Sequence, residues 1–194
     1  MLKSKLQKYR LILASGSPRR QQFLKDLDLD FEIRLKEIEE IFPPELKAKE
    51  ITNYLAELKA SAFKGELKAF EILITSDTIV WHNNKALGKP KDAQDAFTIL
   101  KSLSNATHEV ITSVCFTTNV GSTLIYETTK VTFNVLSDEA IRYYIENYKP
   151  FDKAGAYGIQ EWIGFIGVSK IEGSYANVMG MPTDKVYEYL SKLP

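Results

Sequence analysis

The sequence of 194 residues contains one cysteine, Cys115, and only two histidines. No intrachain disulfide is therefore possible, and the apolar, β-branched surroundings of Cys115 favour an inert buried thiol over a nucleophile. His82 and His108 lie far apart in the sequence and lack the spacing of metal ligands. No serine–histidine–acid arrangement can be recognised, so nucleophilic hydrolysis by such a triad has little support.

Long apolar runs and an excess of charge of one sign are also absent. No apolar stretch reaches ~18 residues, so we expect no transmembrane helix. The apolar run after the basic N-terminus is too short for a secretory signal, and we therefore expect a cytoplasmic location. Lysine plus arginine and aspartate plus glutamate both number 25, so the formal net charge is zero. This balance argues against broad binding to nucleic acid or to a membrane surface, and any anion site must be a local concentration of charge.

Helical and strand patterns alternate along the chain, and they predict an α/β fold with a mixed, twisted sheet flanked by helices. We find no repeat and no long linker, so we expect a single domain over residues 1–194, which could form two lobes around a central cleft. A hairpin turn is expected at Asn83-Asn84. Asp92 and Ser137 are expected to cap the helices at 93–103 and 138–147. Strands are predicted at residues 11–14, 31–35, 72–81, 110–118, 124–135 and 164–171, and helices at 18–27, 48–65, 93–103, 138–147 and 183–193.

The segment 11–20 (LILASGSPRR) is the most informative stretch. It is typical of a short buried strand that ends at a turn of small residues and leads into a helix carrying Arg19 and Arg20. Ser17 suits the N-cap, and Pro18 suits the first helical position. Free N–H groups at the helix start, together with two guanidinium groups, would suit a phosphate chain. The alternative is a strand–helix joint with two solvated arginines, and the spacing is not that of a Walker A loop.

Asp77 lies within the apolar strand predicted at 72–81. A carboxylate there costs free energy unless it is paired, bound to a metal or at an exposed strand end. We interpret it as a metal ligand or general base, with a satisfied structural aspartate as the alternative. Glu40 ends a run of acidic residues that is either a solvated face or a source of a second carboxylate for the same divalent ion.

Three further polar residues stand in suggestive positions. Lys89 follows Gly88 and could reach a phosphate, although an isolated lysine is more often a surface cation. Lys59 lies within a predicted helix, where a surface position is the default. Gln160 follows a loop rich in glycine and alanine, and its amide could read a base edge as donor and acceptor. The alternative for that loop is a packed structural role.

Short informative segments lie along almost the whole chain, at residues 13–20, 76–78, 87–90, 108–112, 152–160, 173–175 and 178–182. Taken together and in this order, they resemble the Maf family of nucleoside triphosphate pyrophosphatases. The resemblance implies a metal-dependent enzyme that uses Mg²⁺ or Mn²⁺ and cuts a nucleoside triphosphate between its α and β phosphates. It also implies a fold related to the inosine triphosphate pyrophosphatases and a homodimer.

Within the family, the chain resembles the subgroup that hydrolyses dTTP and UTP, because Arg19, Thr78 and Gln160 match its specificity residues. The resemblance implies Asp77 and Glu40 as metal ligands. It implies Asp77, Lys59 and Lys89 as catalytic residues. It implies substrate binding by Ser15, Ser17, Arg19, Arg20, Thr78 and Gln160. Asp152 and Lys153 could pair with each other or border the phosphates.

The chain departs from the family pattern at several positions. Ser76 replaces a common alanine and Ser113 a common glycine, Tyr148-Lys149 replaces Gly-Glu, and Glu161-Trp162 follows Gln160 where glycine is typical. Two alternative functions stay open. One is a non-catalytic nucleotide-binding regulator of cell division, and the other is the same chemistry on another modified nucleotide, as in a housecleaning enzyme.

Overall fold

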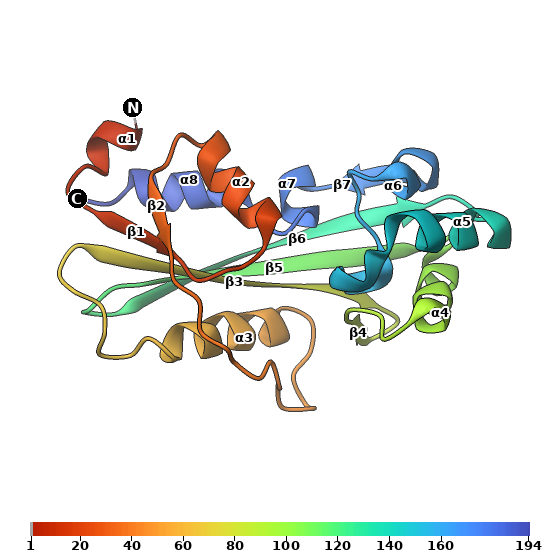
Figure 1. Cartoon of the computed structure of the whole chain (residues 1–194), viewed down its shortest axis with the longest axis horizontal. Helices are drawn as coiled ribbons and strands as arrows, with labels where there is room; N and C mark the ends of the chain where they lie inside the picture. Colours follow the sequence, from red (N-terminus) through yellow and green to blue (C-terminus); the bar gives the residue numbers. More distant parts are fainter. Residues whose placement is uncertain (1) are drawn as a thin grey trace. The chain divides into compact units, whose positions relative to one another are not determined.

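A seven-stranded mixed sheet runs through the computed structural model, which describes residues 2–194. Its strand order is β2-β1-β3-β5-β6-β7, and β4 pairs with β3. β1 is parallel to β2 and β3, whereas the β3–β4 and β6–β7 pairs are antiparallel. The predicted mixed α/β fold is thus confirmed (Figure 1). The strands are β1 Arg10–Leu13, β2 Phe31–Ile33, β3 Glu71–His82, β4 Lys85–Leu87, β5 Thr107–Thr117, β6 Ser122–Phe133 and β7 Val168–Glu172.

The helices accompany these strands in chain order, and two short 3₁₀ turns lie between α5 and α6. None of the described helices combines the length and apolar character needed to cross a membrane. The helices are α1 Leu2–Lys5, α2 Pro18–Asp26, α3 Lys49–Ser61, α4 Ala93–Leu103, α5 Asp138–Tyr148, α6 Trp162–Gly167, α7 Tyr175–Val178 and α8 Thr183–Ser191, and the 3₁₀ turns are Pro150–Asp152 and Ala154–Ala156.

The chain divides into two compact units. The first contains the chain up to Asp77, then Thr112–Glu127 and Gly180–Pro194. The second contains Thr78–Ile111 and Thr128–Met179. Strands β3, β5 and β6 contribute residues to both units, so the boundaries fall within strands.

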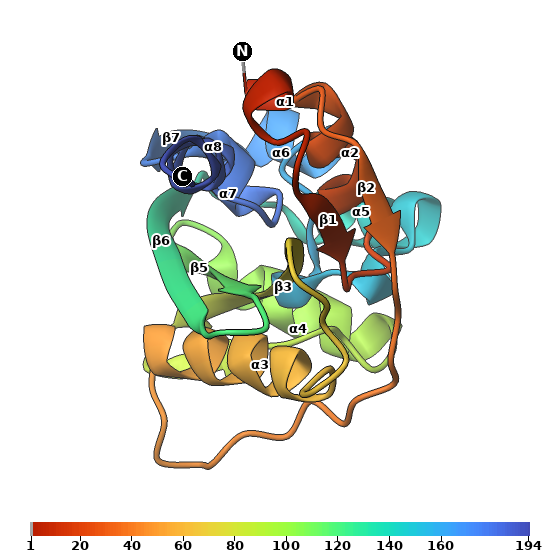
Figure 2. The ribbon, with the colours of Figure 1, turned by 90° about the vertical axis from the view of Figure 1, so that its left-hand side faces the viewer.

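The core of the first unit follows from the two-residue period of its strands. In β1, Leu11 and Leu13 join one cluster with helices α2 and α8, whereas Ile12 joins another with α3. β3 and β5 alternate in the same way, so α3 covers one face and α2 and α8 cover the other (Figure 2). Cys115 is fully buried on the α3 side, and burial raises the pKa of its thiol. The expectation that this thiol is buried is thereby confirmed, and its raised pKa disfavours the reactive thiolate form.

Glu71, the first residue of strand β3, lies in a network of ion pairs in the first unit. The buried carboxylate of Glu71 accepts hydrogen bonds from Arg34 Nη2 at 2.8 Å and from the Lys68 backbone N–H at 3.0 Å. Arg34 Nε also donates to Glu32 at 2.6 Å. The hydrogen bond from Arg34, followed by that from Lys68, lowers the pKa of Glu71 to about 2.

This depressed pKa predicts a loss of stability in acid. A group whose pKa is lower in the folded state stabilises the fold above its unfolded pKa, and that contribution is lost as the pH falls through the folded value. We expect the free energy of unfolding to fall by about 2 kcal/mol between pH 5 and pH 2 on account of Glu71. Urea unfolding across that range should show a flatter pH dependence in Glu71→Gln, and equal slopes would contradict this role.

The second unit packs α4 and α5 against its strands. Asp92 and Ser137 cap these helices as predicted, because their side chains accept hydrogen bonds from Asp95 N and Ala140 N. A hydrogen bond of 2.7 Å joins His108 Nε2 and the hydroxyl of Tyr157 in the core. Burial lowers the pKa of His108 to about 3, which favours the neutral imidazole in this hydrogen bond.

Three sequence predictions need correction. The predicted strand at 164–171 is wrong over its first half, because residues Trp162–Gly167 form α6 and β7 begins only at Val168. A short apolar run is compatible with a strand and with a helix. Here Gly164 packs closely against the backbone of Ile159, and this contact accommodates a helical turn. The second predicted helix ends at Ser61 rather than 65. Ser17 does stand at the N-cap of α2, but its side chain accepts no capping hydrogen bond.

Candidate active site

Asp77 lies at the end of the β3 segment that belongs to the first unit, and its side chain is only 8% exposed. Lys59 of α3 places its Nζ 2.7 Å from Asp77 Oδ1. The same Nζ lies 3.0 Å from Glu40 Oε1, in the long connection before α3. The structure therefore brings two predicted carboxylates together around one predicted lysine.

Arg20 reaches this group from the first turns of α2. Its Nη1 donates to the Ser76 carbonyl at 2.9 Å, and its Nε donates to the Gly180 carbonyl at 3.0 Å. Burial lowers the pKa of Arg20, the charges of Asp77 and Glu40 oppose that effect, and the charge of Arg19 adds to it. The charges of Arg19, Asp77 and Glu40 therefore all act on the guanidinium group of Arg20.

Ser15 and Ser17 complete this part of the site. The Ser15 hydroxyl accepts from Arg20 Nη1 at 3.4 Å and from the Ser17 backbone N–H at 3.3 Å. The turn that contains Ser15 and Ser17 therefore contacts the guanidinium group of Arg20 in the helix that follows. Lys59 Nζ also donates to the Ser76 carbonyl at 3.4 Å, the same carbonyl that accepts from Arg20. These contacts link six predicted residues within the first unit: Ser15, Ser17, Arg20, Glu40, Lys59 and Asp77.

Gly180 is a site residue that the sequence reasoning did not single out. Its carbonyl accepts from Arg20, and its φ of 112° is a conformation that residues with a side chain rarely adopt. Gly180 lies in the run 178–182, one of the segments that resemble the Maf family, and this resemblance was the only indication in the sequence that it could belong to the site. Ser76, in contrast, contributes its backbone carbonyl, and its buried hydroxyl has no partner among the described residues.

Four predicted residues remain. Arg19 lies in α2 and belongs to the first unit, whereas Thr78, Lys89 and Gln160 belong to the second unit. The Gly155 N–H donates to the Gly88 carbonyl at 3.1 Å, which ties the loop before Gln160 to the segment of Lys89. Lys89 is exposed and Gln160 is half-buried. Lys153 Nζ lies 2.8 Å from Asp152 Oδ1, so these two residues do pair with each other.

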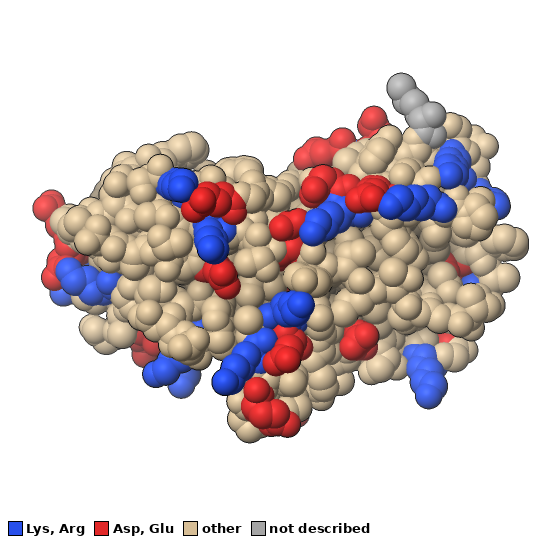
Figure 3. All heavy atoms as spheres, turned by 180° about the vertical axis from the view of Figure 1, so that it is seen from behind, with Lys and Arg blue, Asp and Glu red and all other residues tan. Residues whose placement is uncertain are grey.

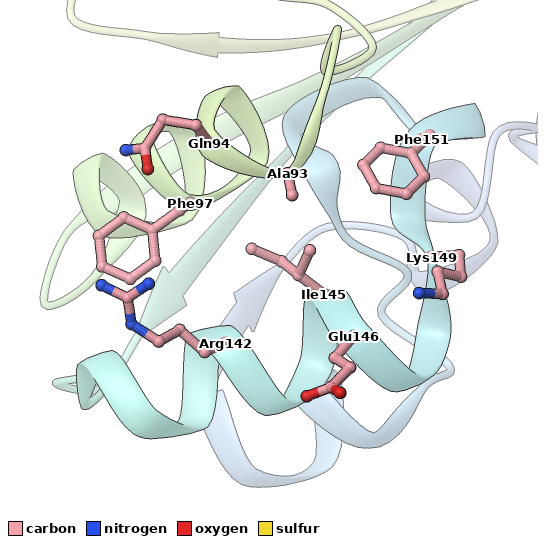
Figure 4. Close-up of a pocket in the computed structure, with 8 residues that line it drawn as sticks. All are labelled: Ala93, Gln94, Phe97, Arg142, Ile145, Glu146, Lys149 and Phe151. Carbon is pink, nitrogen blue, oxygen red and sulfur yellow. The ribbon is translucent and has the colours of Figure 1, made fainter.

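A separate cavity of about 460 Å³ lies in the second unit between α4 and α5. Phe97 and Arg142 lie at one end of it and Lys149 and Phe151 at the other (Figure 4). The Arg142 guanidinium packs on the Phe97 ring, with its carbon 4.6 Å from the ring centroid. None of the predicted site residues lines this cavity.

The charges of the site are local rather than part of a broad field. On the face shown in Figure 3, acidic and basic side chains are interspersed among the described residues. This pattern agrees with the zero formal net charge. The guanidinium group of Arg20 and the ammonium group of Lys59 therefore belong to a local cluster of both signs, together with the carboxylates of Asp77 and Glu40.

A model of the family described as Maf-like protein matches residues 10–193. The chain belongs to the Maf-like protein family. The match covers every predicted site residue, from Ser15 to Gln160. The segments that suggested the resemblance all lie within the matched residues.

Individual Maf-like relatives match over the full chain. A protein of Flavobacterium johnsoniae named dTTP/UTP pyrophosphatase is 76% identical over 193 residues, which is 100% of both chains. A protein of the same name from Flavobacterium psychrophilum is 66% identical over 98% of this chain and 97% of its own length. Among solved structures, the Ham1 protein of Staphylococcus aureus gives a TM-score of 0.52 at 13% identity, covering 94% of this chain and 98% of that one. This last similarity concerns the fold alone.

The donor chemistry of the Maf-like site fits a divalent cation that is bound partly by its substrate. Among the described residues, no group of three or more histidine, cysteine, aspartate or glutamate side chains could hold a metal. Asp77 and Glu40 supply two carboxylates around Lys59 Nζ. Mg²⁺ is commonly held by one or two carboxylates together with substrate phosphates and water. The chain therefore has the oxygen donors for an ion that arrives with a polyphosphate.

Proposed function

We propose that this protein hydrolyses dTTP and UTP between the α and β phosphates, giving a nucleoside monophosphate and pyrophosphate. The observation that carries the proposal is the group of Asp77, Glu40 and Lys59, with Arg20 in the same electrostatic environment. Membership of the Maf-like family and the 76% identical relative named dTTP/UTP pyrophosphatase support it. The carboxylates of Asp77 and Glu40 are suited to binding a divalent metal ion and a water molecule, and the cationic groups of Lys59 and Arg20 are suited to binding a triphosphate.

In the proposed reaction, Asp77 accepts a proton from the water that attacks the α-phosphorus, or orients that water. Arg19, Arg20, Lys59 and Lys89 neutralise the charge of the triphosphate and of the leaving pyrophosphate, which is the usual basis of phosphoryl-transfer catalysis. Asp77 and Glu40 would hold Mg²⁺ or Mn²⁺, which supplies polarisation of the phosphate oxygens. Thr78 and Gln160 would hydrogen-bond the pyrimidine, which presents both a carbonyl and an N–H.

The test is product analysis with a panel of nucleotides. The purified protein is incubated with Mg²⁺ or Mn²⁺ and canonical, 7-methylated and 5-substituted nucleoside triphosphates, and monophosphate, diphosphate, orthophosphate and pyrophosphate are resolved. We expect UMP and dTMP with pyrophosphate and little turnover of purines. Pyrophosphate mainly from another base would favour the modified-nucleotide alternative. Binding without turnover would favour the regulator.

Arg20→Lys is expected to lower kcat/KM for UTP by about 100-fold, or about 2.7 kcal/mol of transition-state stabilisation. A lysine has no planar fork with which to bond the Ser76 and Gly180 carbonyls at the same time. Arg142→Lys is a matched control, because Arg142 is exposed and lies in the cavity between α4 and α5. Equal kinetics for Arg20→Lys and the control would contradict the role of Arg20.

A further inference from the structure

The segment that carries Gln160 is held by few regular backbone hydrogen bonds. It passes through the 3₁₀ turn Ala154–Ala156, in which Gly155 and Ala156 have φ values of 70° and 58°. The 3₁₀ turn ends at Ala156, and α6 begins only at Trp162. Besides the backbone hydrogen bond from Gly155 to Gly88, side chains that join this segment to the rest of the second unit therefore contribute to the position of Gln160.

Glu161 makes such a connection with both of its carboxylate oxygens. Its Oε1 lies 3.1 Å from the Nζ of Lys153, at the start of the segment. Its Oε2 accepts a hydrogen bond from the hydroxyl of Tyr144, a fully buried residue of α5. The Tyr144 oxygen in turn accepts from the Gly158 backbone N–H at 3.0 Å. One carboxylate thus links the two ends of the segment to the core.

The Glu161 carboxylate packs closely against the segment and pairs with a buried lysine. A Cβ on Gly158 would lie 2.8 Å from the Glu161 carboxyl carbon, so the side chain packs directly on the segment. The side chain of Lys153 is only 9% exposed, whereas that of its other partner, Asp152, is 64% exposed. Glu161 therefore supplies the more enclosed counter-charge to a buried ammonium group, whose desolvation demands one.

We propose that Glu161 is a positioning residue that fixes the segment 153–161 and thereby holds Gln160 for recognition of the pyrimidine. This inference rests on the proposed function for the role of Gln160. It gives a physical role to a departure from the family pattern, because Glu161 stands where glycine is typical. Glu161 itself acts through Lys153, Tyr144 and the Gly158 backbone rather than on the substrate.

Glu161→Gln tests the proposal with almost no change in shape. A carboxylate accepts hydrogen bonds on both oxygens, whereas an amide has one accepting oxygen and one donating nitrogen. Glutamine can therefore accept from Lys153 or from Tyr144 in this arrangement but not from both, and it carries no charge to pair with the Lys153 ammonium. We expect KM for UTP to rise about 10-fold to 100-fold with a much smaller change in kcat, and the preference for UTP over CTP to narrow.

Hydrogen exchange gives a second measurement that does not depend on turnover. Amides of residues 153–161 should exchange faster in Glu161→Gln, while those of β1 and α8 in the first unit should not change. Glu139→Gln is the matched control, since Glu139 is an exposed residue at the start of α5. Unchanged exchange in the segment, or faster exchange throughout the chain, would overturn the inference.

The two measurements also separate this inference from the proposed function. A wild-type protein that releases no pyrophosphate from UTP or dTTP would refute the proposed function, while the exchange of residues 153–161 would still decide whether Glu161 fixes the segment. An active wild-type protein whose KM and base preference are unchanged by Glu161→Gln would refute the positioning role alone.

Discussion

Asp77→Asn is expected to lower kcat for UTP by about 10³-fold to 10⁴-fold, the largest effect on activity that the site predicts. Asparagine keeps the shape of the side chain but removes the negative charge that meets Lys59 Nζ at 2.7 Å. It can neither accept the proton of the attacking water nor serve as an anionic metal ligand. Steady-state release of pyrophosphate at several Mg²⁺ concentrations is the measurement.

The matched control for that substitution is Asp184→Asn. Asp184 is an exposed aspartate in the first turn of α8, in the same unit as Asp77. We expect it to keep wild-type kinetics. Full turnover by Asp77→Asn with an unchanged demand for metal would show that the central assignment is wrong, whereas a fall in both variants would indicate a general effect of lost charge.

Gly164→Ala is expected to destabilise the fold by more than about 3 kcal/mol, the largest structural effect predicted here. A Cβ at this position would lie 1.9 Å from the carbonyl oxygen of Ile159 and 2.5 Å from its carbonyl carbon. Both are backbone atoms, so no side-chain rotation can relieve the overlap. The first turn of α6 or the residues before Gln160 would have to move.

Urea unfolding of Gly164→Ala, monitored by tryptophan fluorescence, measures that cost. Gly121→Ala is a suitable control, because nothing lies within 4 Å of a Cβ built on Gly121. We expect the control to unfold at the wild-type midpoint. A Gly164→Ala protein whose free energy of unfolding lies within about 0.5 kcal/mol of wild type would contradict the close packing of α6 on Ile159.

Local signals in the sequence predicted much of the fold. Asp92 and Ser137 placed the starts of α4 and α5 correctly because a capping side chain acts on its own helix. Runs of apolar and β-branched residues located β1, β3, β5 and β6. The run at 164–167 was assigned wrongly, because the helical turn there depends on contact with Ile159, which is a tertiary interaction.

The candidate site was predictable in its residue types but not in its connections. The sequence suggested that Glu40 and Asp77 share one divalent ion, and it singled out Lys59 on its own; the structure joins all three residues through Lys59 Nζ. The role of the Gly180 carbonyl depends on a contact between residues 160 positions apart in the sequence. The bridge from Glu161 to Lys153 and Tyr144 likewise needs the three-dimensional path of the chain.

The central claim is that water attacks the α-phosphorus of a pyrimidine nucleoside triphosphate. Hydrolysis of UTP in ¹⁸O-labelled water, followed by mass spectrometry of the products, tests it most directly. The account predicts UMP that carries one ¹⁸O atom and pyrophosphate that carries none. Label in the pyrophosphate would place the attack on the β-phosphorus, and UDP with labelled orthophosphate would place it on the γ-phosphorus; either result would contradict the account.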